Sequence, residues 1–282
     1  MIDKAYLEIT NICNLSCSFC HKTGREKRQM TAEEFEQLTD RLVGEVRYLY
    51  FHLMGEPLLH PLLPQFIKRA WEKGFRPMLT TNGTLLKTRG EALLETPPYK
   101  ISISLHAPAA NAAFSDADYL PSSVDFAEKA AKRGVISVLR LWNLGGEGEE
   151  ENAPILRYLH ARFPGEWGKV RGGSSLRLAD KLFLEWGEEF DWPDLSAPVC
   201  PPEADCFCFA LRDQIGILVD GTVVPCCLDA EGALALGNLF STPLASILTS
   251  DRARGIYDGF TRRRAAESLC RRCGYARRFS KN

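Results

Sequence analysis

The sequence predicts an α/β protein: a partial (β/α)6 barrel of the TIM type, followed by a small cysteine-rich α+β domain. From Lys4 to about Arg162, short apolar runs alternate with amphipathic stretches, a pattern typical of βαβ units and a parallel sheet. Near residues 191–198 the composition shifts toward proline and turn residues, which indicates a boundary between domains 1–195 and 196–282. The first domain is too short for a closed barrel of eight units.

The barrel elements follow one another in regular order. Expected strands lie at residues 6–10, 48–53, 77–81, 101–105 and 137–141, with a sixth near 176–184. Expected helices lie at residues 32–43, 64–73, 86–94, 124–133 and 153–163. Thr31 followed by Glu34 predicts a capping box at the start of the first helix.

The C-terminal domain is predicted to contain a hairpin and two short helices. The apolar runs 214–219 and 222–225 flank Asp220-Gly221, a dipeptide typical of tight hairpin turns. Helices are expected around residues 243–249 and 262–269.

Composition limits the class of protein. Hydrophobic residues make up 45% and charged residues 25% of the 282, values typical of a globular protein. No apolar run reaches the ~18 residues of a membrane helix, and the N-terminus lacks a signal-peptide pattern. We therefore expect a cytoplasmic protein without a membrane segment. The net charge of −1 argues against a nucleic-acid binder.

The ten cysteines are unevenly distributed. Cys13, Cys17 and Cys20 lie near the start, and the other seven lie between Cys200 and Cys273. In a reducing compartment, clustered thiols favour metal or cluster ligation over disulfides.

The first three cysteines form the pattern C-x₃-C-x₂-C directly after the first expected strand. Three thiolates on one loop can hold three irons of a [4Fe–4S] cube and leave the fourth iron open for chemistry. The alternative is a zinc site completed by His21. Adjacent Cys20 and His21 could hardly both reach one ion, so we favour the cluster.

These cysteines resemble the signature of the radical S-adenosylmethionine (SAM) superfamily, in which an aromatic residue occupies the position of Phe19. Further landmarks of the family follow in its order: Met54-Gly55-Glu56-Pro57, Thr80-Thr81-Asn82-Gly83, the strand 101–106 with Ser104, and Arg140. The resemblance implies that the SAM contacts come from Phe19, Gly55, Glu56, Asn82, Ser104 and Arg140. His106 and Arg140 are candidates for a role in catalysis.

The resemblance also implies a mechanism. SAM chelates the open iron, and one electron from the reduced cluster cleaves it to methionine and a 5′-deoxyadenosyl radical, which abstracts hydrogen from a C–H bond. The electron would come from a reductant such as flavodoxin or ferredoxin.

Each landmark also has a structural interpretation. The Gly55-Glu56-Pro57 segment could be an ordinary turn, and Ser104 could simply line the barrel interior. Arg140 could pair with a buried acid. His106 could face the substrate or only stabilise the end of its strand.

A second cysteine set consists of Cys208, Cys226, Cys270 and Cys273. Four thiolates complete a [4Fe–4S] cube and suit electron transfer, although a Cys₄ zinc site fits the same ligands. The spacing C-x₁₂-G-x₄-C from Cys208 to Cys226 resembles the SPASM/twitch auxiliary domains of the same superfamily, which implies a second cluster. Cys206 or Cys227 could replace its neighbour as a ligand, and Cys200 has no predicted role.

The function expected from this resemblance is an oxidative C–H modification. The substrate would be either a small alcohol or sugar-like molecule that is dehydrogenated, or a peptide that is modified. The alternative from another class is a non-catalytic iron–sulfur or zinc protein that transfers electrons or binds RNA.

Overall fold

The computed structural model describes residues 2–111, 113–146, 148–168, 173–201 and 204–279. These residues contain one ten-stranded sheet, with the order β10-β9-β8-β1-β2-β3-β4-β5-β7-β6. Its strands are β1 (Lys4–Leu7), β2 (Tyr48–Tyr50), β3 (Arg76–Thr81), β4 (Lys100–Ser104), β5 (Ile136–Leu144), β6 (Ser175–Ala179), β7 (Leu182–Glu188), β8 (Gln214–Ile217), β9 (Thr222–Val224) and β10 (Gly237–Asn238).

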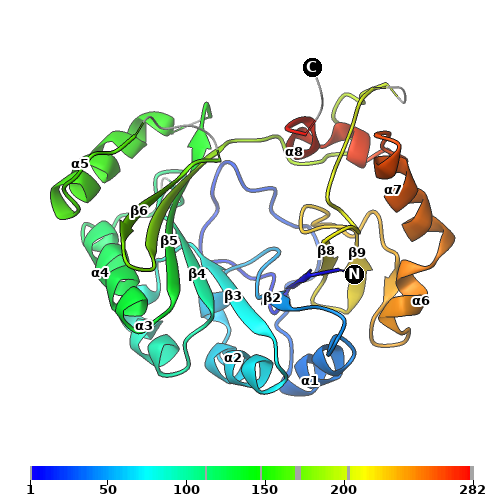
Figure 1. Cartoon of the computed structure of the whole chain (residues 1–282), viewed down its shortest axis with the longest axis horizontal. Helices are drawn as coiled ribbons and strands as arrows, with labels where there is room; N and C mark the ends of the chain where they lie inside the picture. Colours follow the sequence, from blue (N-terminus) through cyan, green and yellow to red (C-terminus); the bar gives the residue numbers. More distant parts are fainter. Residues whose placement is uncertain (1, 112, 147, 169–172, 202–203, 280–282) are drawn as a thin grey trace.

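The central strands β8, β1 to β5 and β7 pair in parallel, whereas β6, β9 and β10 pair antiparallel at the two edges. The sheet curves into an arc around the interior without closing (Figure 1). The predicted partial barrel is confirmed.

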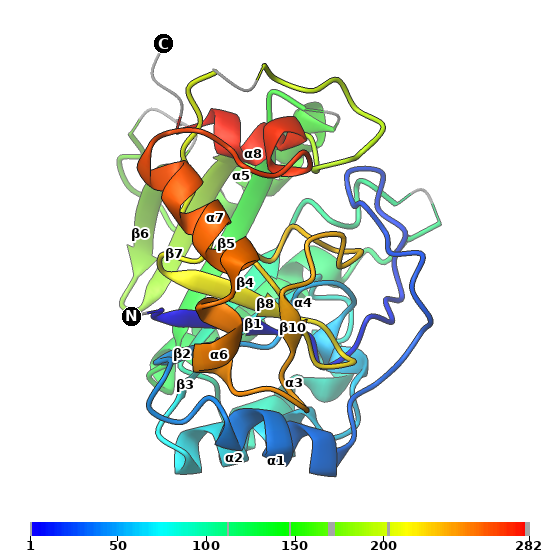
Figure 2. The ribbon, with the colours of Figure 1, turned by 90° about the vertical axis from the view of Figure 1, so that its right-hand side faces the viewer.

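Helices cover the outer side of this arc (Figures 1 and 2). They are α1 (Ala32–Asp40), α2 (Leu63–Glu72), α3 (Leu86–Glu95), α4 (Tyr119–Lys132), α5 (Asn152–Arg162), α6 (Leu244–Leu248) and α7 (Asp251–Thr261), whereas α8 (Gly274–Arg277) lies at the open side of the arc (Figure 1). The Thr31 hydroxyl accepts a hydrogen bond from the Glu34 amide, and the Glu34 carboxylate accepts one from the Thr31 amide. The predicted capping box is therefore present.

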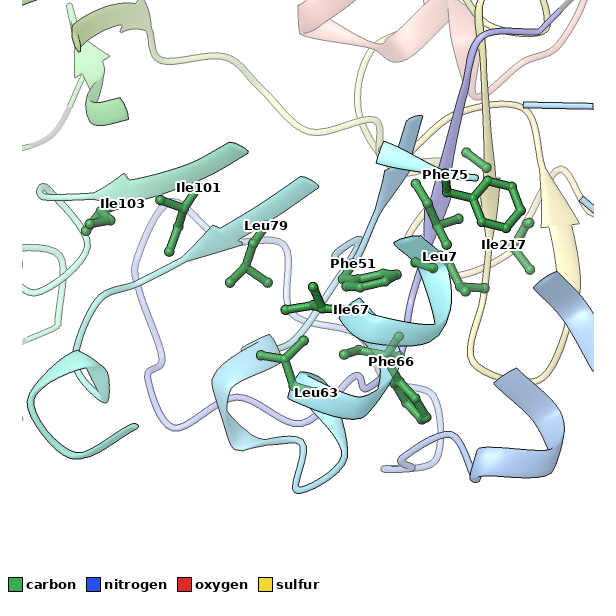
Figure 3. Packing of buried hydrophobic residues seen from close by; sticks show 14 of the residues in the cluster. Leu7, Phe51, Leu63, Phe66, Ile67, Phe75, Leu79, Ile101, Ile103 and Ile217 are labelled. Atoms are coloured by element: carbon green, nitrogen blue, oxygen red, sulfur yellow. The ribbon is translucent and has the colours of Figure 1, made fainter. Parts of the chain in front are cut away.

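The main core lies between the strands and these helices. Figure 3 shows Phe51, Leu79 and Ile101 from the strands facing Leu63 and Ile67 of α2. Phe35 and Phe66 stack with ring centroids 4.1 Å apart between α1 and α2. Burial of these apolar faces fixes which side of each strand points outward. The opposite side is left to line the interior of the barrel.

Two predicted elements differ from the structure. The expected single strand near 176–184 is the hairpin β6–β7, because Lys181 takes a positive φ of 55° and turns the chain back. The prediction of a helix at 262–269 is wrong, because the helix of this region, α7, ends at Thr261 and so precedes the segment. Ser250 caps α7, and Arg263, with φ 55°, follows its end.

The sheet continues across the predicted domain boundary. Strand β8 of the C-terminal region pairs with β1 from Lys4 to Leu7, so both regions share one sheet. The division at residue 195 stays a prediction. No helix among the described residues is long and apolar enough to cross a membrane.

A buried ion pair joins three distant segments at the end of β1. The carboxylate of Glu8, which is fully buried, accepts hydrogen bonds from Arg25 Nη2 at 2.6 Å, the Met54 amide at 3.3 Å and the Val219 amide at 3.0 Å. Arg25 also donates through Nε to the Ala230 carbonyl at 2.8 Å. One carboxylate thus links the cysteine loop, the end of β2 and the C-terminal hairpin.

We expect Glu8→Ala to destabilise the protein by about 3–5 kcal/mol, because it leaves the charge of Arg25 buried without its partner. In a chain of this size that corresponds to a fall in Tm on the order of 10 °C. Glu91→Ala is the control, because Glu91 forms an exposed ion pair with Lys129 that is worth less than about 1 kcal/mol. Equal falls in Tm for the two variants would contradict a linking role for Glu8.

Candidate active site

The first three cysteines lie on a long loop between β1 and α1 whose base is closed by hydrogen bonds. Thr10 and Gln29 form an antiparallel bridge across the base. The side chain of Asn11 accepts from the Arg28 amide at 2.8 Å and donates to the Glu26 carbonyl at 2.7 Å. These contacts bring the two ends of the loop together and hold the cysteines at the end of β1.

The three thiols lie close enough to influence one another. Cys13 is exposed, Cys17 is buried and Cys20 is half-buried. Burial, together with the neighbouring thiolates of Cys20 and Cys13, raises the pKa of Cys17 to about 12. A bound cation is needed to hold such a group of sulfurs as thiolates. The donor set and its environment therefore fit an iron cluster.

Gly55 packs directly against this loop. It has a φ of 78°, and an added Cβ would lie 2.5 Å from the Thr10 carbonyl oxygen and 2.9 Å from that of Ile12. The next amide, of Glu56, donates to the Ile12 carbonyl at 2.8 Å. The segment is thus more than a turn, because it fixes the cysteine loop against the end of β2.

The carboxylate of Glu56 is already engaged within the protein. It accepts from the Leu58 amide at 2.9 Å, the Thr81 hydroxyl at 2.7 Å and the Asn82 amide at 2.7 Å. Burial raises its pKa. These bonds tie the end of β2 to the end of β3. A contact between Glu56 and SAM stays a prediction, and the structure directs its carboxylate toward β3.

Asn82 lies beside Cys13, as the order of the motifs predicts. Its Nδ2 is 3.9 Å from Cys13 Sγ and donates to Asn14 Oδ1 at 3.0 Å. Asn14 in turn donates to the hydroxyl of Thr84 at 2.8 Å. The sequence analysis missed Asn14 and Thr84, because neither residue belongs to a recognised motif and only the fold brings them together.

The end of β4 contacts the other side of the cysteine loop. The rings of Phe19 and His106 are 5.0 Å apart, and Cys17 Sγ lies 3.4 Å from the Ala107 carbonyl. The carbonyl of Ser104 accepts from the hydroxyl of Tyr119 at 3.1 Å. Burial lowers the pKa of His106 to about 4, so its imidazole is neutral near pH 7. The predicted SAM contacts Phe19, Gly55, Asn82 and Ser104 all lie around this loop.

The second cysteine set lies around a cavity of about 280 Å³ in the barrel interior. Cys208, Cys226, Cys270 and Cys273 line this cavity, together with Cys227. The pKa of Cys226 is raised by burial and by the nearby Cys227, Cys208 and Cys270.

Two further cysteines lie on the far side of Cys270 and Cys273. Cys200 and Cys206 share with them a smaller cavity of about 30 Å³, so the choice between Cys206 and Cys208 as a ligand stays open. Within the described ranges, no three His, Cys, Asp or Glu side chains are arranged around a single metal ion. The ligands of a [4Fe–4S] cube bind different irons.

Arg140 lies on β5 in register with Ser104 of β4, another predicted SAM contact. Its side chain lines the large cavity, with its Cζ 3.4 Å from the centroid of the Trp142 ring. The cysteine loop and Gly55 do not line that cavity. The backbone carbonyl of Arg140 accepts from the Leu105 amide at 3.0 Å and lies 3.2 Å from His106 Nδ1.

We expect Gly55→Ala to lower the iron bound at the cysteine loop, because the new methyl group would displace the carbonyls of Thr10 and Ile12. Gly44→Ala is a matched control: Gly44 has nearly the same φ, 79°, but no atom within 4 Å of an added Cβ. Iron and sulfide analysis of anaerobically reconstituted protein measures the difference. Equal iron loss in both variants would mean that only backbone strain matters.

Replacing Cys13, Cys17 and Cys20 together by alanine should remove about four of about eight irons per chain, since each cube holds four. Zinc with little sulfide in the unaltered protein would contradict both clusters.

Comparison with known families agrees with this geometry. The family model of the radical SAM superfamily matches residues 7–159, more than half of the chain. A second family model, SPASM, described as an iron–sulfur cluster-binding domain, matches residues 206–274.

Curated relatives match only the N-terminal region. The tungsten-containing aldehyde ferredoxin oxidoreductase cofactor-modifying protein of Pyrococcus furiosus is 36% identical over 85 residues, 29% of this chain and 24% of that protein. The GTP 3′,8-cyclase of Aquifex aeolicus is 37% identical over 109 residues, 36% of this chain and 34% of that enzyme. The matched region thus spans about a third of one relative and a quarter of the other.

Solved structures share the fold over nearly the whole chain. BtrN in complex with AdoMet and 2-DOIA has a TM-score of 0.61 at 18% identity, covering 97% of this chain and 93% of BtrN. Streptococcus suis SuiB has a TM-score of 0.62 at 17% identity, covering 97% and 71%. The enzyme anSMEcpe with bound AdoMet has a TM-score of 0.62 at 15% identity, covering 90% and 79%. The two domains imply SAM and two iron–sulfur clusters as cofactors. The chain therefore belongs to the radical SAM superfamily and carries a C-terminal SPASM domain.

Proposed function

We propose that this protein cleaves SAM reductively and oxidises a C–H bond of a small alcohol or sugar-like substrate. The observation that carries the proposal is the cavity between the barrel strands and the second cysteine set. A substrate bound there would lie beside a cluster with four protein ligands, which can take up an electron but has no open iron.

Cys13, Cys17 and Cys20 would hold a cluster that, with SAM, would supply the means to remove a hydrogen atom from a C–H bond, and the second cysteine set would hold a one-electron acceptor, so that an alcohol could lose a hydrogen atom, an electron and its hydroxyl proton to become a ketone. The residues of the chain hold these groups in place. Gly55 and Asn82 position the cysteine loop, and Phe19 and His106 close its inner side. The aromatic rings of Tyr6, Tyr50 and Trp142 line the cavity and would exclude water from it.

Several similarities support these choices. The BtrN structure, which covers most of this chain, was solved with AdoMet and 2-DOIA. SuiB has also been solved with its precursor peptide SuiA, so modification of a peptide side chain remains the second candidate.

The exposed Cys13 marks where an external reductant such as flavodoxin or ferredoxin would deliver electrons. We propose a cytoplasmic location, in which thiols stay reduced.

The first test is SAM cleavage. Reconstituted protein with dithionite should produce 5′-deoxyadenosine from SAM, as measured by chromatography. Absence of this product in protein that carries both clusters would overturn the proposed function and favour an electron carrier.

The second test separates the clusters. Cys270→Ala with Cys273→Ala should lose about four irons and the oxidised product, whereas reductive SAM cleavage should persist because the ligands of the first cluster are intact. The same loss could follow from unfolding, since a bound cluster also stabilises its domain. A melting curve and spectra of the remaining cluster serve as the control. Normal substrate turnover by a folded double variant would show that the second cluster is structural.

A further inference from the structure

The cavity contains a buried guanidinium, that of Arg140, beside the carboxylate of Glu185, its register partner on β7. Among the described residues, no side chain or backbone group forms a hydrogen bond or ion pair with the guanidinium of Arg140, and its Nε is shielded from solvent without a partner. A buried charge is costly unless it is paired and hydrogen-bonded. Such a group indicates a partner that binds from outside the chain.

The stacking on Trp142 holds this guanidinium in one plane. Arg140 Cζ lies 3.4 Å above the indole. The indole also packs against Gly187, where an added Cβ would lie 2.8 Å from the ring. A fixed planar guanidinium presents two N–H groups in the geometry that matches a carboxylate.

The other charged groups in the cavity are already satisfied. Lys100 and Glu185 form an ion pair at 3.5 Å. The carboxylate of Asp229 accepts from the amides of Ala233 and Leu234 at 2.9 and 2.8 Å. Glu185 is also the register partner of Arg140 and attracts its charge, so two cations share this carboxylate, and Arg140 forms no ion pair of its own among the described residues.

Two neutral donors or acceptors lie in the same cavity without partners. They are His52 Nδ1 and Trp142 Nε1. Burial lowers the pKa of His52 to about 3, so its ring is neutral. The ring packs edge-on against the rings of Tyr6 and Tyr50, at 5.5 and 5.7 Å. Unsatisfied polar atoms next to an ion site suit a ligand that carries further hydroxyl or amide groups.

We propose that this cavity binds a substrate that carries a carboxylate, with Arg140 as the residue that binds the carboxylate. The inference rests on the proposed function and narrows its substrate class to small organic acids. The cysteine-lined end of the cavity belongs to the cluster, and the end lined by Tyr6, His52 and Arg140 receives the substrate.

A carboxylate could also come from the methionine part of SAM, as the resemblance to the family implies. The position of Arg140 favours the substrate. Its guanidinium shares the cavity with Glu185, Tyr275 and Cys227; burial lowers its pKa, and Glu185 and then these two groups act in the opposite direction. None of Cys13, Cys17, Cys20 and Gly55 lines that cavity.

The experiment uses three probes of one size and different charge: benzoate, benzamide and benzylamine. Their binding to the protein with both clusters is measured by anaerobic equilibrium dialysis, with and without saturating SAM. We expect benzoate to bind at least tenfold more tightly than either other probe, and SAM not to displace it. Equal binding of the three probes overturns the anion site. Competitive displacement of benzoate by SAM assigns Arg140 to SAM and overturns the inference.

Variants then assign the binding to Arg140. Arg140→Gln should weaken benzoate binding at least tenfold and leave benzamide binding within twofold. The benzoate affinity of Arg140→Lys should lie between those of the unaltered protein and Arg140→Gln, because lysine keeps the charge but lacks the planar guanidinium. Arg177→Gln is the matched control, because it removes an equal charge from an exposed ion pair with Asp180 on the β6–β7 hairpin.

If Arg140 instead adjusts the midpoint potential of the auxiliary cluster, the same variant gives a different result. If Arg140→Gln shifts the midpoint potential of the auxiliary cluster and leaves benzoate binding unchanged, Arg140 only neutralises the cluster and the inference is wrong. Production of 5′-deoxyadenosine by the unaltered protein is measured on the same preparation. Its absence contradicts the proposed function, whereas the probe titrations still decide the anion site.

Discussion

The arrangement of the molecule depends on one buried carboxylate. Glu8 follows the first strand and is fully removed from solvent, yet it accepts hydrogen bonds from a charged side chain and two backbone amides. Because a buried carboxylate is stable only when its oxygens are satisfied, the three donors must stay where they are. They belong to the cysteine loop, the end of β2 and the C-terminal hairpin, so this one group fixes both cysteine sets relative to the sheet.

A second buried carboxylate links neighbouring strand ends one strand further along the sheet. Glu56 ties the end of β2 to the end of β3 through three hydrogen bonds, and Gly55 lets the backbone approach the cysteine loop. The polar residues at the strand ends therefore act mainly on the protein itself. They hold the cysteine loop against the strand ends, so that the cysteines are the groups left to bind a cofactor.

The polar groups in the interior of the barrel are less completely hydrogen-bonded. There the carboxylates and Lys100 are paired, whereas Arg140, His52 and Trp142 retain unsatisfied polar atoms. The partial barrel makes this possible, because its sheet does not close and side chains do not fill the centre. The stability that these orphaned groups cost must come from the apolar layer between the strands and the helices, where Phe35, Phe66 and their neighbours are fully buried.

The sequence by itself determined the order of strands and helices, the capping box at Thr31 and both cysteine sets, because these depend on local periodicity and spacing. It failed at 262–269, where Arg263 takes a left-handed conformation just beyond α7. It also could not assign Asn14, Glu8 or the surroundings of Arg140. The partners of these side chains are distant in the chain: Glu8 and Val219 are 211 residues apart. Only the pairing of β8 with β1 brings residues such as Glu8 and Val219 together, and so only the tertiary structure decided which buried polar groups are hydrogen-bonded and which are not.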